Sequence, residues 1–157
     1  MKAEYINPFI SSLVEVLEQY VEDIEFERGE LDVIEQPTET LGTMTLVGIS
    51  GDLQGRVLYI MNRPAAVSIA EIMNGEDFPG LNEMVRSTIQ ELCNIVSGNA
   101  ATKLRQAADD KTIDLTPPSM VVGTDTEISD NINGKLLEVP LETNYGDILV
   151  NLAVKER

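Results

Sequence analysis

Three polar residues in the segment VRSTIQELCNIVSGN are spaced so that their side chains could act at one site. Ser87, Glu91 and Asn94 stand at positions i, i+4 and i+7, and Pro117 follows after twenty-two intervening residues. At about 100° per residue, the three polar positions form one stripe along a helix. A carboxylate and a carboxamide one turn apart on an exposed stripe can reach together into a partner's site. The pattern therefore predicts chemistry performed on another macromolecule.

The same segment indicates how that stripe is held outward. Val85, Ile89, Leu92 and Val96 repeat at the apolar spacing of a helix face that packs on a core. We therefore expect the polar stripe to face solvent.

Other chemistry is restricted because the sequence contains no histidine. This excludes Ser-His-Asp and Cys-His nucleophile pairs, phosphohistidine transfer and nearly all catalytic zinc sites. Cys93, the single cysteine, has no nearby cation that would make its thiol reactive, and we interpret it as a packing residue. An enzyme of this composition must act through carboxylates, amides or a partner's groups, and we expect no metal site in this chain.

Composition indicates one cytoplasmic globular domain covering residues 1–157, with 43% hydrophobic and 24% charged residues. The net charge of −16 argues against binding to nucleic acid or to an anionic membrane, which both require clustered cations. The chain has no apolar run long enough to span a bilayer, and its first residues, MKAEYINPF, lack the pattern of a secretory signal. A single cysteine fits a reducing compartment.

Periodicity and turn residues predict three helices and six strands. The helices are expected at about 7–23, 64–74 and 81–108, and Pro8 and Asn74-Gly75 provide start and stop signals. The strands are expected at 24–34, 43–50, 55–61, 119–128, 135–142 and 147–154. Turns are expected at 51–54, 133–134 and 144–146.

The order of these elements indicates an internal duplication. Residues 5–62 and 81–157 each contain a helix followed by three strands, so we predict an α+β fold with an antiparallel or mixed sheet packed on long helices. Ser11, Glu15 and Glu18 in the first helix repeat the spacing of Ser87, Glu91 and Asn94, with Glu in place of Asn.

The complete spacing Ser87-x3-Glu91-x2-Asn94-x22-Pro117 resembles the motif of the CheC/CheX/FliY family of chemotaxis phosphatases. The opening Asn7-Pro8-Phe9 and the order of elements extend the resemblance over essentially the whole chain. CheC-type members carry the Glu-x2-Asn pair in both halves, whereas this chain has Glu18 in the first half and is therefore most similar to the CheX type. FliY is a poorer match because its additional flagellar-switch domain is absent.

The resemblance implies a CheC-like fold and an enzyme that hydrolyses the aspartyl phosphate of a CheY-type response regulator. Asn94 would position the attacking water, and Glu91 would pair with a lysine of the receiver domain. Ser87 would lie against the partner, and Pro117 would shape the backbone at the site. The divalent cation would belong to the receiver, and the protein would be a homodimer. We expect the dimer to form by pairing unpaired edge strands of the two sheets, such as the strand at 147–154.

Two other interpretations remain open at this point. The chain could be a non-catalytic module that sequesters a receiver domain or a flagellar switch component, or a structural dimerisation domain in which the Glu91–Asn94 stripe is only solvated. Faster loss of phosphate from a phosphorylated receiver on addition of the protein, without consumption of a nucleotide, would distinguish catalysis from both.

Overall fold

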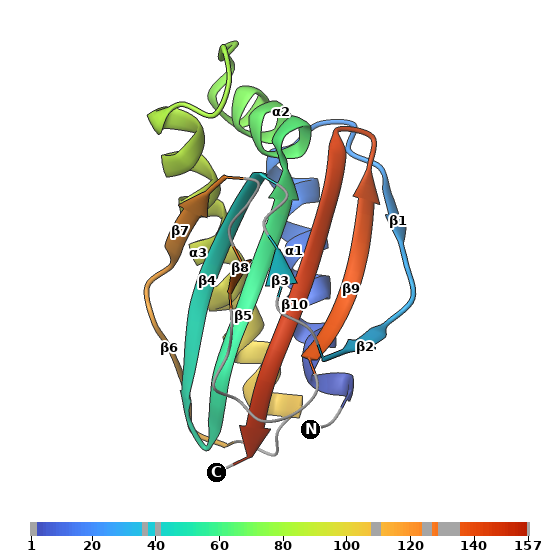
Figure 1. The fold of residues 1–157 in the computed structure, drawn as a ribbon, viewed down its shortest axis with the longest axis vertical. Coiled ribbons are helices and arrows are strands. Elements are labelled where there is room, and N and C mark those ends of the chain that lie inside the picture. The colour runs from blue at the N-terminus through green and yellow to red at the C-terminus, as the bar shows by residue number, and fades with distance from the viewer. Residues whose placement is uncertain are drawn as a thin grey trace.

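Three helices cover one face of an antiparallel sheet in a computed structural model of the chain (Figure 1). The structure describes residues 3–35, 38–39, 42–107, 111–123, 127–128 and 136–156. Helices α1 (Asn7–Tyr20) and α3 (Glu83–Ala107) lie side by side against the sheet, and α2 (Arg63–Asn74) covers one end. A short 3₁₀ helix, Ala3–Ile6, precedes α1.

The main sheet has the order β1-β9-β10-β5-β4-β6, with β2 also paired to β9 and β7 to β4. Two short strands, β3 and β8, pair with each other separately. The strands are β1 (Phe26–Arg28), β2 (Asp32–Ile34), β3 (Thr38–Glu39), β4 (Gly42–Gly51), β5 (Leu53–Asn62), β6 (Ile113–Leu115), β7 (Ser119–Val122), β8 (Glu127–Ile128), β9 (Leu136–Thr143) and β10 (Gly146–Glu156).

Each half of the chain contributes one hairpin to the centre of the sheet and gives its outer strands to the other half. Hairpin β4–β5 is flanked by β6 and β7, whereas hairpin β9–β10 is flanked by β1 and β2. All the pairings among the described residues are antiparallel. The predicted α+β class is confirmed, and the duplication stays a prediction that this exchange of outer strands supports.

Several sequence predictions need correction. The expected strand 24–34 is interrupted between β1 and β2, and the expected strand 119–128 is divided into β7 and β8. Strands β3 and β6 were not expected. The stretch 147–154 was expected to offer an unpaired edge for a dimer, but β10 lies at the centre of the sheet between β9 and β5. The expected turn at 133–134 lies outside the described residues.

Local sequence explains where α2 begins and ends. The side chain of Asn62 accepts a hydrogen bond from the Ala65 amide at 3.1 Å, and Pro64 occupies the first turn, where a missing N–H has no cost. Gly75 ends the helix with φ of 65°, in the left-handed conformation that glycine adopts easily. These signals are local, which is why the sequence located this helix to within one residue.

The core between the helices and the sheet fixes which way α3 faces. Val85, Ile89, Leu92 and Val96 are fully buried, and they pack with the inward side chains of the central strands. Since this face is buried, the opposite face of α3 must point to solvent. None of the helices in the described parts of the chain is both long and apolar enough to cross a membrane.

Candidate functional site

The predicted polar stripe is present on α3. Ser87, Glu91 and Asn94 are all exposed, as the buried apolar face of the helix requires. Among the described residues, none of these three side chains makes a hydrogen bond or an ion pair. Their oxygens and the Asn94 amide nitrogen therefore remain free to contact a partner.

Pro117 is exposed in a bulge between β6 and β7. Both strands pair with β4, but Ile49 pairs with Leu115 and Leu46 pairs with Ser119, so three residues span the two positions between them. Pro117 and Pro118 have no N–H to donate to β4, which favours a break in the ladder at this point. The chain therefore leaves the sheet at Pro117.

Three hydrogen bonds fix the two ends of this bulge. On one side, the Thr116 amide donates to the Gly48 carbonyl at 3.0 Å, and the Gly48 amide donates to Thr116 Oγ1 at 2.8 Å. A Cβ atom at Gly48 would lie 2.9 Å from Thr116 Cγ2, so this close approach needs glycine. On the other side, Gln90 Nε2 of α3 donates to the Pro118 carbonyl at 2.7 Å. These contacts hold Pro117 next to the polar face of α3.

Asn94 and Pro117 meet at an open groove of about 660 Å³ between α3 and the bulge. Residues separated by twenty-two positions in the sequence thus line one surface feature. Ser87 and Glu91 are not part of the groove lining; they precede Asn94 along the same exposed helix face. The groove is also lined by Gly98, Ala101, Arg105, Asp114 and Thr116.

Small residues line part of the groove, among them Ser97, Gly98 and Ala101. Ser97 is buried there, and its hydroxyl shares a 2.9 Å hydrogen bond with the hydroxyl of the fully buried Tyr59. Burial raises the pKa of Tyr59 far above its ordinary value, so this phenol keeps its proton. At Gly98, one turn after Asn94, nothing lies within 4 Å of where a Cβ atom would be. The space beside Asn94 is consequently open.

Cys93 precedes Asn94 but faces the core. Its side chain is buried, and burial raises the pKa of the thiol to about 12. A protonated, enclosed thiol is not a nucleophile at neutral pH. This position agrees with the interpretation of Cys93 as a packing residue.

Three residues that contribute to this site were not predicted from the sequence: Gln90, Gly98 and Thr116. Gly98 carried a local signal, because a glycine inside a long helix costs about 1 kcal/mol relative to alanine and occurs one turn after Asn94. Gln90 and Thr116 carried no such signal, because their roles depend on contacts across elements.

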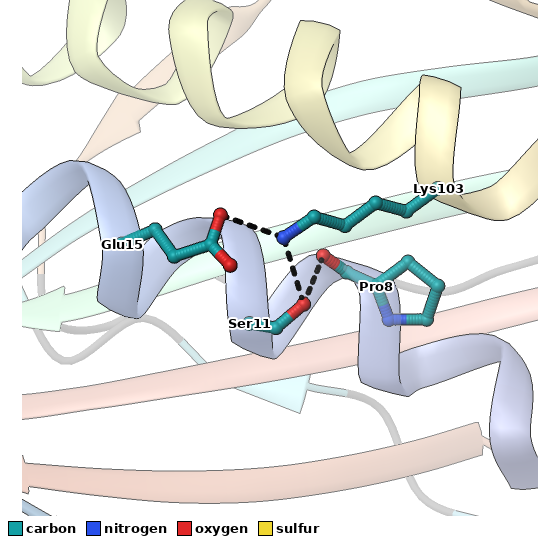
Figure 2. A network of polar contacts seen from close by, with 4 residues as sticks. All are labelled: Pro8, Ser11, Glu15 and Lys103. Carbon is teal, nitrogen blue, oxygen red and sulfur yellow. Dashed lines mark hydrogen bonds and ion pairs between the residues drawn. The ribbon is translucent and has the colours of Figure 1, made fainter.

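The corresponding stripe on α1 is engaged by the chain itself, as Figure 2 shows. Lys103 of α3 places its ammonium 2.7 Å from Glu15 Oε2 and 3.1 Å from Ser11 Oγ. Lys103 lies nine positions after Asn94, which at about 100° per residue is the opposite side of α3. Glu18 is exposed on the same helix as Ser11 and Glu15. The two stripes therefore lie on separate faces. Ser11 and Glu15 are bonded to Lys103, whereas Ser87, Glu91 and Asn94 have no bonded partner among the described residues.

In the described parts of the chain, no group of three or more Asp, Glu or Cys side chains is arranged to hold a metal ion.

Comparison with known proteins gives consistent matches. A family model described as "Chemotaxis phosphatase CheX" matches residues 43–142, which include the α3 stripe and Pro117. The chain is 29% identical over 157 residues to the CheY-P phosphatase CheX of Thermotoga maritima, covering 99% of this chain and 98% of that protein.

Solved structures support the same fold. One is the CheX-CheY-BeF3-Mg+2 complex of Borrelia burgdorferi, with a TM-score of 0.80 and 28% identity over 99% of this chain and all of the matched chain (100%). Another is a CheC-like superfamily protein from Shewanella sp. PV-4, with a TM-score of 0.86 and 24% identity over 99% of each chain, a likeness that concerns the fold.

Proposed function

This chain belongs to the CheX family of chemotaxis phosphatases, and we propose that it hydrolyses the aspartyl phosphate of a CheY-type response regulator. The observation that carries this proposal is the meeting of Asn94 and Pro117 at one open groove, with Glu91 one turn away on the same exposed helix face. The structure of the CheX relative from Borrelia burgdorferi is a complex with CheY, BeF3 and Mg+2. This supports the proposal that the divalent cation belongs to the receiver.

Asn94 is the residue for the chemical step. In that step a water oxygen attacks phosphorus, the bond from phosphorus to the aspartate oxygen breaks, and the receiver regains its carboxylate while inorganic phosphate leaves. An amide is no base near neutral pH, but its oxygen can accept a hydrogen bond from the water and its nitrogen can donate another. Asn94 thus holds the water in line, as a glutamine does in GTPases.

Glu91 is the residue for recognition. A free carboxylate close to a phosphoryl group would be repelled, so its favourable partner is a cation, and a receiver lysine supplies one. Pro117 lines the same groove as Asn94, where its ring adds a fixed, apolar wall without an N–H. The phosphatase works in the cytoplasm, where response regulators are phosphorylated.

The direct test is a dephosphorylation assay. A CheY-type receiver is phosphorylated by acetyl phosphate, the donor is removed, and loss of phosphate is followed with and without this protein. Acceleration at substoichiometric protein, with no nucleotide present, supports the phosphatase. Binding without acceleration would instead identify the sequestering module.

We also propose that the protein is a homodimer, in which the subunits pair through outer strands of the sheet and not through β10. The open strand edges of the described sheet belong to β1 and β2 on one side and to β6 and β7 on the other, and an unpaired edge favours pairing with a second chain.

The stripe on α1, made of Ser11, Glu15 and Glu18, is expected not to contribute to dephosphorylation. Glu15 is already paired with Lys103, and Glu18 would bring a carboxylate against the phosphoryl oxygens without an N–H to donate. Glu15→Ala and Glu18→Ala should therefore leave the dephosphorylation rate within about twofold of wild type. A loss of activity in either variant, with unchanged thermal stability, would contradict a single site per subunit. Glu18→Asn in an Asn94→Ala background tests whether a donor at this position restores a little activity.

Gly98 is expected to lower the stability of α3 but to keep the groove beside Asn94 open. Gly98→Ala should raise the free energy of unfolding by about 0.5–1 kcal/mol, because alanine loses less conformational freedom in a helix and a Cβ atom meets nothing within 4 Å. Gly98→Gln should also stabilise the helix, but its long side chain fills the space beside Asn94 and should slow dephosphorylation at least tenfold. Urea unfolding and the phosphate assay measure the two effects. If Gly98→Gln keeps full activity, the groove is not part of the receiver site.

A further inference from the structure

The chain contains its own example of a lysine bound by a Ser-x3-Glu pair. Ser11 and Glu15 are one turn apart on α1. Lys103 Nζ donates a hydrogen bond to Ser11 Oγ at 3.1 Å and another to Glu15 Oε2 at 2.7 Å (Figure 2). The Ser11 hydroxyl donates its own proton to the Pro8 carbonyl at 3.4 Å, so its lone pairs are available to the ammonium. We call such a Ser-x3-Glu pair on one helix face an ammonium clamp.

Helix α3 presents the same pair, and no lysine or arginine of the described chain is bonded to it. Ser87 and Glu91 have the spacing of Ser11 and Glu15, both are exposed, and neither side chain makes a hydrogen bond or an ion pair within the described residues. A serine inside a helix commonly donates its hydroxyl proton to the carbonyl three or four residues earlier, as Ser11 does. The Ser87 hydroxyl makes no hydrogen bond within the described residues, so its lone pairs are available to an ammonium beside the Glu91 carboxylate.

We propose that Ser87 and Glu91 form a second ammonium clamp, which binds a lysine of the receiver domain through both side chains. This inference rests on the proposed function, since it specifies how that partner is recognised. A lysine ammonium is compact and has three rotatable donors, which suit two acceptors one helical turn apart, whereas the planar arginine fork suits one bidentate carboxylate. Lys103 cannot fill this clamp, because it is directed to α1 from the opposite side of α3.

The clamp predicts that Ser87 contributes to binding and not to the chemical step. Ser87→Ala should weaken affinity for a CheY-type receiver activated with beryllium trifluoride and Mg²⁺ about three- to tenfold, the range for a lost hydrogen bond. KM for the phosphorylated receiver should rise by the same factor, with kcat unchanged. Ser87→Asp, which keeps an acceptor, should restore wild-type affinity or exceed it. Thr102→Ala removes another exposed hydroxyl from the same helix and serves as the matched control.

A double-mutant cycle tests whether Ser87 and Glu91 share one ligand. In a Glu91→Ala background the ammonium is no longer held there, so adding Ser87→Ala should change affinity less than twofold. The clamp is overturned if Ser87→Ala binds the receiver as well as Thr102→Ala does, or if its effect is the same with and without Glu91. A wild-type protein that neither binds nor dephosphorylates the receiver would refute the proposed function instead, and so the two failures are distinguishable.

Discussion

Asn94→Ala should remove nearly all of the phosphatase activity, with a fall in kcat on the order of 10²–10³, while binding to the activated receiver persists. Positioning one water in line with the scissile bond accounts for about 3–4 kcal/mol of barrier reduction, and alanine has neither the acceptor nor the donor to do it. Asn94 is exposed and makes no hydrogen bond within the described structure, so its removal should not destabilise the fold. Single-turnover loss of phosphate, measured at saturating phosphatase, isolates the chemical step.

Asn99→Ala provides the control for this prediction. Asn99 is also exposed on α3, but it does not line the groove that holds Asn94 and Pro117. It should retain wild-type kcat. Full activity in Asn94→Ala would show that the water is positioned by the receiver or by another residue of this chain.

Reversing the charge at Glu91 should abolish the complex at micromolar concentrations. A lysine at this position would face the receiver's own lysine, and like charges brought together in an interface cost several kcal/mol, which exceeds a hundredfold in affinity. Glu91→Ala should be milder, about tenfold weaker, because it removes the attraction without adding repulsion. Isothermal titration with the beryllium-activated receiver measures both variants. Their effects should shrink as salt is raised, since part of the interaction is screened.

Glu142→Lys is the matched control for net charge. Glu142 is exposed on β9, on the far side of the sheet order from the strands that border the groove, and the substitution changes the charge of the protein by the same amount. If this control weakens binding as much as Glu91→Lys does, the effect is one of overall charge. If Glu91→Lys binds normally, Glu91 does not contact a receiver cation.

The parts of the site that follow from one helix could be predicted from the sequence. The prediction that Ser87, Glu91 and Asn94 face solvent was correct, because the spacing of the apolar residues within α3 determines which face of the helix is buried. Their proposed roles in catalysis and binding remain predictions. The limits of α2 were correct for a similar reason, since Asn62 and Gly75 act on neighbouring backbone groups.

The parts that depend on contacts between distant segments could not be predicted. Strand β6 has three residues, too few for a periodic signal, and it exists because it pairs with β4. Lys103 reaches Glu15 only because α1 and α3 pack side by side, and no pattern within either helix indicates this. The central position of β10 is likewise set by the sheet order. Its alternating sequence is equally compatible with an edge.

The exchange of outer strands also determines when this protein can fold during its synthesis. Phe26 of β1 has its partner at Thr143 of β9, and the two are made roughly 6 to 23 s apart at the usual rates of translation. Until then the hairpin β4–β5 has no β10 beside it, and an isolated hairpin is at best marginally stable in water. The nascent chain therefore emerges from the ribosome with its apolar strands uncovered. We therefore expect its first half to be prone to aggregation until the last strand is released.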